Sequence, residues 1–171
     1  MTNFLEQLVA EWYEYEGYFV RRNVLVGKWP GGGFDCELDV VAFNPVTKHL
    51  LHVEPSTDAA SWDEREQRYA KKFEAGRRHI PGMFAGLLPP EAVPEQVALF
   101  VFAPAGRQRT LAGGRVVHVS DFLGQIVSRF AQAPMTKGQV PEQFSLLRMA
   151  QFLVEYFDVK IKGGREKGET T

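Results

Sequence analysis

Three acidic side chains are spaced so that they could together hold a metal ion. Glu37, Asp39 and Glu54 each fall in a segment whose pattern predicts a β-strand. If the turn between the two strands centres on residues 46–47, antiparallel pairing puts Asp39 opposite Glu54 and Glu37 opposite Ser56. Side chains alternate between the faces of a strand, and cross-strand neighbours lie roughly 4.5–5.5 Å apart. The sequence therefore predicts three carboxylates on one patch.

The chemistry of such a patch favours a hard divalent cation. Like charges directly opposite each other destabilise a sheet by about 0.2–1 kcal/mol at exposed sites, and by more when they are desolvated. Mg²⁺ is bound through one or two carboxylates, several waters and usually a substrate phosphate. A site that acts on phosphodiesters is therefore one interpretation. The other is that these acids lie on a solvated sheet face, or pair with arginine and lysine.

Alternation and turn residues predict the strands that carry these acids. Residues 37–43 predict the first strand, residues 49–54 predict the second, and Asn44-Pro45 starts the turn between them. Pro55 is expected to close the second strand, because proline cannot donate to a ladder. The two strands should therefore pair over most of their length.

A helix and a further strand precede this pair. Thr2 or Asn3 can cap a first helix that runs to about Glu16, and Gly17 ends it. Residues 18–27 then alternate as a strand does. The chain should therefore enter the acidic pair of strands from an antiparallel neighbour.

The rest of the chain predicts a crossover to a buried strand. A capping box from Ser61 to Glu64 opens a helix that is expected to last to about His79. The later elements are a strand over 96–103, a strand over 115–119, a helix from Ser120 or Asp121 to about 131, and a last helix from about 141 with an apolar stripe from Phe144 to Phe157. This order implies a mixed sheet with helices on both faces, and so a mixed α/β (α+β) fold.

Two polar residues lie on or beside the apolar stripe of the helix that begins near residue 62. Glu66 interrupts the stripe, which includes Tyr69 and Phe73, and Lys72 flanks it. The common fate of a lysine in this position is to lie along apolar surface with its ammonium group in water. Helical position alone therefore assigns no role to either side chain.

Composition sets bounds on size, partners and compartment. The chain has 171 residues and a formal net charge of -1, which fits a single domain over 1–162 and a polar tail over 163–171. No overall basic field indicates nucleic acid, although an acidic metal site offsets positive charge elsewhere. The single Cys36 excludes an internal disulfide and a cysteine-rich zinc site. With no signal segment or long apolar run, we expect a cytoplasmic protein with no membrane partner.

Three short motifs carry a family resemblance. ELDVV at 37–41 lies on one predicted strand, HVEPS at 52–56 lies on the next, and Gly17-Tyr18 ends the first helix. With the order of elements, these motifs resemble the PD-(D/E)XK, or restriction-endonuclease-like, superfamily of nucleases. The spacing from Glu6 to Gly17 is similar to that in the archaeal Holliday-junction resolvases of this superfamily, whose first-helix glutamate helps to bind metal.

This resemblance implies a restriction-endonuclease-like fold with an αβββαβ core, and a nuclease that hydrolyses phosphodiester bonds of DNA with Mg²⁺ or Mn²⁺. Asp39 and Glu54 would match the two metal-binding acids, and Glu6 would match the first-helix acid. Glu37, from the same acidic patch, is a further candidate ligand. Dimerisation would fit an enzyme that cuts both strands of a duplex.

The chain departs from the family pattern at one position. Ser56 stands where the family has its lysine, two residues beyond the second acid. That lysine positions or helps to deprotonate the attacking water and stabilises charge on the phosphate, and a serine hydroxyl does neither as a cation would. Some family members take the lysine from the following helix, where Lys72 is the best placed candidate. Glu66 on that helix could instead add a metal ligand.

Other candidate residues are basic. Six arginines are candidates for phosphate contacts, although each alone is an ordinary surface charge more often than not: Arg21, Arg22, Arg77, Arg78, Arg107 and Arg109. His52 falls on the acidic face by alternation, and we leave it out of the site because a lone histidine there is more often packed or hydrogen-bonded than catalytic.

Two further hypotheses remain beside the nuclease. One is a nuclease fold whose chemistry has lapsed and which acts as a nucleic-acid-binding or interaction module, as Ser56 and the near-neutral charge favour. The other is a protein unrelated to nucleic acid, in which Glu37, Asp39 and Glu54 pair with arginines. Metal binding separates the nuclease from an ion-pair network, and cleavage separates it from a binding module.

Overall fold

The computed structural model describes residues 3–89, 91–102, 110–133 and 135–157. These residues form two compact units that divide after Phe122. The first unit contains a central sheet and the acidic residues of interest, and the second is helical.

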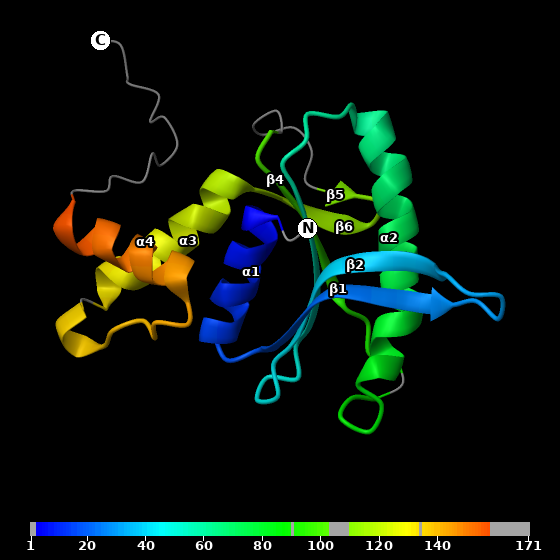
Figure 1. Ribbon diagram of the computed structural model, residues 1–171, viewed down its shortest axis with the longest axis horizontal. Helices are drawn as coiled ribbons and strands as arrows, with labels where there is room; N and C mark the ends of the chain where they lie inside the picture. The colour runs from blue at the N-terminus through cyan, green and yellow to red at the C-terminus, as the bar shows by residue number, and fades with distance from the viewer. Residues whose placement is uncertain (1–2, 90, 103–109, 134, 158–171) are drawn as a thin grey trace, which may run out of the picture. The chain divides into compact units, whose positions relative to one another are not determined.

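A mixed sheet forms the centre of the first unit (Figure 1). Its described strands are β1 (Phe19–Lys28), β2 (Phe34–Phe43), β3 (Leu50–Ser56), β4 (Glu95–Phe100), β5 (Thr110–Leu111) and β6 (Gly114–His118). Their order is β1-β2-β3-β4-β6-β5. The pairs β1–β2, β2–β3 and β5–β6 are antiparallel, whereas β3–β4 and β4–β6 are parallel. The predicted mixed sheet with a helical crossover is confirmed.

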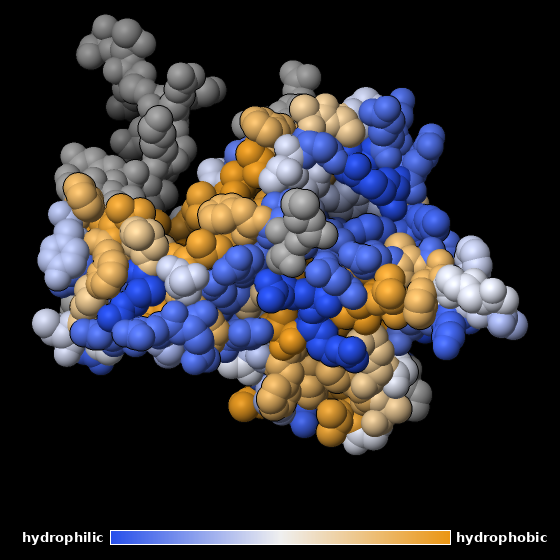
Figure 2. All heavy atoms as spheres, in the orientation of Figure 1, coloured by the Kyte–Doolittle hydropathy of each residue, from blue (hydrophilic) through white to orange (hydrophobic). Residues whose placement is uncertain are grey.

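Two helices lie on opposite faces of this sheet, α1 (Phe4–Tyr15) on one and α2 (Trp62–Met83) on the other (Figure 1). Each begins with a capping box, formed by Asn3 with Glu6 and by Ser61 with Glu64, which satisfies backbone N–H groups of the first turn. Both starts agree with the sequence prediction. Figure 2 shows hydrophilic residues along the outer side of α2, so its apolar stripe faces the sheet.

Apolar residues of the strands and of α2 make the core of the first unit. Between sheet and helix, Leu38, Val41 and Phe43 pack with Ile80 of α2 in one buried cluster. A second cluster includes Phe73 of the same helix with residues of β4 and β5. Burial of side chains of this size stabilises by about 1.5–3 kcal/mol each. This packing holds α2 in place over the sheet.

Several element ends differ from the sequence prediction. β2 begins at Phe34 because a tight turn pairs that residue with Lys28 of β1. β3 does not end before Pro55 but continues to Ser56, since its last residues pair with the parallel strand β4, as in Pro55 with Leu99. α2 passes the predicted end at His79 and contains Pro81 in its last turn, where the missing N–H costs a single intrahelical bond.

The second unit contains the greater part of α3 (Val119–Gln132), a 3₁₀ turn η1 (Met135–Lys137) and α4 (Ser145–Tyr156). The last helix begins at Ser145 and not near residue 141. Its buried positions include Leu147 and Gln151, whereas Leu153 and Phe157 of the predicted stripe are exposed. The Gln151 amide ties down the preceding segment, because it accepts from the Val140 N–H at 2.9 Å and donates to the Gly138 carbonyl.

Some sequence predictions fall on residues outside the described ranges. These are the basic loop with Arg107 and Arg109 and the tail over 163–171. The strand predicted over 96–103 is shorter than expected, because β4 ends at Phe100 and the next two residues form a bend. Within the described ranges, none of the helices is long and apolar enough to span a membrane.

Candidate metal and phosphodiester site

The site lies where β2 and β3 separate. The last ladder pair between them joins Val40 to Val53, and beyond it β2 continues beside β1 while β3 continues beside β4. Extending this register puts Asp39 opposite Glu54, as the sequence predicted from a turn at 46–47. In place of a backbone ladder bond, the Asp39 N–H donates to Glu54 Oε1 at 3.1 Å. The separation therefore leaves room for a carboxylate between the two strands.

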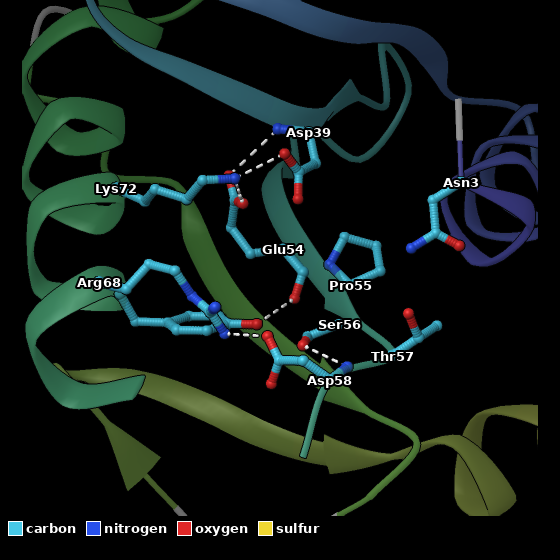
Figure 3. Close-up of a pocket in the computed structure, with 10 residues that line it drawn as sticks. Asn3, Asp39, Glu54, Pro55, Ser56, Thr57, Asp58, Arg68 and Lys72 are labelled. Carbon is cyan, nitrogen blue, oxygen red and sulfur yellow. Dashed lines mark hydrogen bonds and ion pairs between the residues drawn. The ribbon is translucent and has the colours of Figure 1, made fainter. Parts of the chain in front are cut away.

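Lys72 of α2 joins the two acids. Its Nζ donates to Asp39 Oδ1 at 2.6 Å and also donates to Glu54 Oε2 (Figure 3). The exposed fractions of the side chains are 1% for Glu54, 17% for Asp39 and 21% for Lys72. Two carboxylates thus share one ammonium group at the bottom of an open site.

The charges of these three groups strongly perturb one another. Burial, reinforced by the neighbouring Glu54 charge, raises the pKa of Asp39 from 3.8 to about 7. Burial also raises the pKa of Glu54, although Lys72 opposes the rise. Burial by itself would lower the pKa of Lys72, but Glu54 and Asp39 outweigh it and raise that pKa. Lys72 is therefore protonated at neutral pH. A further positive charge beside Asp39 and Glu54 would stabilise the ionised forms of both acids.

A buried histidine completes the surroundings of Glu54. His52 is fully buried, and its Nε2 lies 2.7 Å from Glu54 Oε1. Burial, together with the Lys72 charge, lowers the pKa of His52 from 6.5 to about 3, so the ring is neutral. Tyr69 of α2 adds a hydrogen bond from its hydroxyl to the Glu54 backbone carbonyl at 3.1 Å. Glu54 thus has hydrogen-bond partners in Lys72, His52 and Tyr69.

The acids open into a cleft of about 230 Å³. Its walls come from the N-terminus of α1, from β2, from β3 with the turn after it, and from α2. The lining residues are Asn3, Asp39, Glu54, Pro55, Ser56, Thr57, Asp58, Arg68, Tyr69 and Lys72. Arg68 lies one turn before Lys72 on α2 and pairs with Asp58 at 2.6 Å (Figure 3). A second cation thus faces the same cleft.

The other predicted acids take different positions. Glu6 closes the α1 capping box, where its Oε2 accepts from the Asn3 N–H at 3.3 Å. Burial raises the pKa of Glu6 and Asp39 adds to the rise, so the two carboxylates are close enough to interact. Glu37 is exposed on β2 and does not line the cleft. Glu66 accepts from the Ala112 N–H at 3.1 Å, on the side of α2 that faces β5.

The described arginines of the prediction lie outside the cleft lining. Arg21 and Arg22 are exposed on β1. Arg77 donates to the Gln96 side chain at 2.6 Å, and Arg78 pairs with Glu74 at 2.7 Å on the surface of α2. A role in binding phosphate stays a prediction for these residues.

Sequence reasoning missed three contributors to the site. Arg68 could have been found from its spacing, since residues four apart on a helix share a face with Lys72. His52 was placed on the correct face but set aside, and Gln96 was predicted only as the first residue of the strand over 96–103. The contact between His52 and Gln96 joins β3 to β4. No local sequence pattern predicts which residues of these two strands lie side by side.

The donor set was compared with what a metal ion requires. Over the described residues, no group of three or more His, Cys, Asp and Glu side chains is arranged to hold a metal. Asp39 and Glu54 form a pair, and Mg²⁺ needs only one or two protein carboxylates because waters and phosphate complete its shell. The excess negative charge, with the raised pKa of Asp39, fits a hard divalent cation.

Comparison with known proteins gives no match: no family model, curated protein or solved structure is similar to this chain. The geometry of the cleft therefore supplies the evidence on function.

Proposed function

We propose that this protein is a Mg²⁺-dependent nuclease of the restriction-endonuclease-like fold, which hydrolyses phosphodiester bonds of DNA. The element order α1-β1-β2-β3-α2-β4 supports the proposal, because it matches the αβββαβ core that the sequence resemblance implies. So does the position of Asp39 and Glu54 at the separation of β2 and β3, inside a cleft.

The single observation that carries the proposal is the contact of Lys72 with both acids. In the family motif, a lysine also lies beside the two metal-binding carboxylates. That lysine comes from the strand of the second acid. Here Ser56 takes the place of that lysine, and an amine from α2 reaches the same pair of acids. The chemistry that the substitution at Ser56 removes from β3 is thus available from the helix.

Each residue has a defined role in the proposed reaction. Asp39 and Glu54 would hold Mg²⁺, which when bound supplies Lewis-acid charge for attack of water on the phosphodiester. Lys72 is kept protonated by the two acids, so it stabilises negative charge on the phosphate and does not act as a base. Arg68, at the mouth of the cleft, is placed to contact a neighbouring phosphate.

A second function has its own supporting observation. Lys72 already neutralises part of the acid pair, so the three side chains could form an internal ion pair in a nucleic-acid-binding or interaction module that does not cleave. Under this alternative the acids take up no divalent cation, or take one up without hydrolysis. Homodimerisation stays a prediction under either function.

Calorimetric titration with Mn²⁺ and a cleavage assay test the proposal. The wild type, Asp39→Asn and Lys72→Met would be titrated and then incubated with linear, nicked and branched DNA. Glu74→Gln and Lys71→Met are matched controls, because both residues are exposed on the same helix. We expect Asp39→Asn to lose binding and cleavage, and Lys72→Met to lose cleavage alone. Mn²⁺ binding without cleavage of any substrate would favour the module, and no binding by the wild type would overturn the metal site.

A further inference from the structure

We propose that Arg77, Gln96 and His52 form a positioning chain that fixes which oxygen of Glu54 faces the cation. This inference rests on the proposed function, since it names further residues of the same site. None of the three lies within the acid pair itself, and the resemblance assigned a role to none of them in the site that acts on phosphodiesters. The chain runs from the surface of α2, across β4, to the buried side of Glu54.

Arg77 sets which groups donate and which accept along this positioning chain. A guanidinium group only donates, so Gln96 must turn its oxygen toward Arg77 Nη1, at 2.6 Å. The amide nitrogen of Gln96 then faces the other way. It donates to the Phe73 backbone carbonyl at 2.8 Å and to His52 Nδ1 at 3.1 Å.

The orientation of Gln96 fixes the tautomer of His52. Because Nδ1 accepts a hydrogen bond, the proton of the neutral ring lies on Nε2. That N–H donates to Glu54 Oε1 at 2.7 Å, and the Asp39 N–H donates to the same oxygen at 3.1 Å. Oε1 is therefore occupied by two fixed donors. Oε2 is the oxygen that faces Lys72 and is left to take a cation.

Helix α2 packs closely against this positioning chain. A Cβ at Gly76 of α2 would lie 2.4 Å from His52 Nδ1 and 3.0 Å from Gln96 Nε2. Glycine in a helix costs about 0.5–1 kcal/mol relative to alanine, so this residue trades helix stability for close approach. The Phe73 ring contacts the His52 ring edge to face, at 5.4 Å between centroids. The imidazole therefore cannot rotate freely.

Substitutions that keep or remove a hydrogen-bond donor test this positioning chain. His52→Gln keeps an N–H near the position of Nε2, whereas His52→Leu and Gln96→Leu remove a donor. Gln151→Leu is the matched control, because Gln151 is a buried amide of the second unit. Mn²⁺ affinity would be measured by calorimetry and folding by thermal unfolding. Loss of a group that orients a metal ligand typically weakens binding about 10–100-fold.

We expect His52→Leu and Gln96→Leu to weaken Mn²⁺ binding at least about tenfold, while His52→Gln and Gln151→Leu stay within about threefold of the wild type. Rescue by glutamine is the result that packing alone would not give. Equal losses in His52→Gln and His52→Leu, or no loss in His52→Leu, would overturn the chain.

Nitrogen NMR of the His52 ring gives a readout that needs no metal. The metal-free wild type should carry its ring proton on Nε2, and Gln96→Leu should lose that preference. A proton on Nδ1 in the wild type would overturn the chain while leaving the proposed function intact. Failure of the wild type to bind Mn²⁺ would instead overturn the proposed function, so the two failures are distinguishable.

Discussion

Two glutamates on neighbouring strands of one sheet have opposite electrostatic surroundings. Glu54 on β3 is 1% exposed, and burial raises its pKa. Glu95 on β4 is 39% exposed, and its contacts with Arg115 at 2.8 Å and His49 at 3.0 Å lower its pKa against the effect of partial burial. Both residues are glutamates on adjacent strands, so their surroundings account for the opposite pKa shifts.

Glu95 is thus an acid that stabilises the fold, whereas the surroundings of Glu54 disfavour its ionised form. Around Glu95, water and a nearby guanidinium balance the carboxylate, which gives an exposed ion pair worth about 0–1 kcal/mol. Around Glu54, two acids share one lysine where water is largely excluded. Such an arrangement costs stability unless a further cation arrives.

Lys72→Met should give the largest loss of stability, about 3 kcal/mol or more by urea unfolding, because it leaves two partly buried carboxylates without a cation. The loss should be greater at pH 9 than at pH 5, where protons can replace the lysine. Addition of Mn²⁺ should stabilise this variant more than the wild type. A variant as stable as the wild type at pH 9 would mean that the acid pair needs no cation.

The pH dependence of stability should reveal two opposing groups. The folded protein keeps a proton on Asp39 that the unfolded chain releases above its ordinary pKa of 3.8, so this group makes stability fall as the pH rises from about 4 to about 7. His52 acts in the opposite sense. Its unfolded form binds a proton below pH 6.5 that the folded form refuses down to about 3, so stability rises over that interval.

Substitution should separate these two contributions. Because Glu54, whose pKa burial also raises, is present in all three proteins, the slopes are compared with that of the wild type. We expect the unfolding free energy of Asp39→Asn to have a more positive slope than the wild type between pH 4 and 6.5, and that of His52→Gln a more negative slope between pH 4 and 7. Each slope is limited to about 1.4 kcal/mol per pH unit for one proton. The wild-type slope should lie between those of the two variants. Parallel pH profiles for all three proteins would contradict the assigned pKa directions.

A matched pair of glycines in α2 tests the close packing behind Glu54. Gly76→Ala should destabilise the protein by about 1–3 kcal/mol and weaken Mn²⁺ binding, since the new methyl group meets His52. Gly82→Ala, in the same helix with nothing within 4 Å, should instead stabilise by about 0.5–1 kcal/mol. Thermal unfolding of both variants gives the comparison. An equal effect of the two substitutions would remove the argument for close approach.

The smallest effect is expected at the exposed pair. Arg115→Met should change the unfolding free energy by less than about 1 kcal/mol and leave Mn²⁺ affinity unchanged. Urea unfolding in low and high salt is the measurement, and salt should reduce even this small difference. A loss as large as that of Lys72→Met would erase the distinction between the two glutamates.

Local sequence patterns predicted the parts of the site that depend on neighbouring segments. The turn at Asn44 sets the β2–β3 register, because its side chain accepts from the N–H groups of Val46 and Thr47. Asp39 was therefore placed opposite Glu54 from sequence alone. Lys72 was selected because the family resemblance allows the lysine to come from the following helix, where this residue flanks the apolar stripe.

The parts that were missed depend on residues far apart in the chain. Pro55 stays in β3 because β4 pairs with it, and that partner strand arrives only after α2 has crossed the sheet. The same pairing brings Gln96 to His52. Neither contact leaves a period or motif in the sequence. Glu37 shares a face with Asp39, but the strands have separated at that point, and alternation does not report where two strands part.

The origin of Lys72 in a helix has a mechanical consequence. When a lysine and an acid occupy one strand, covalent geometry fixes their spacing. Here the spacing between the amine and the two acids depends on how firmly α2 rests on the sheet through Phe73 and Ile80. A slight lift of this helix would separate the charges while every strand stayed paired. The site should therefore lose its geometry on warming before the sheet unfolds, and the proposed activity should fall as the packing of α2 on the sheet loosens.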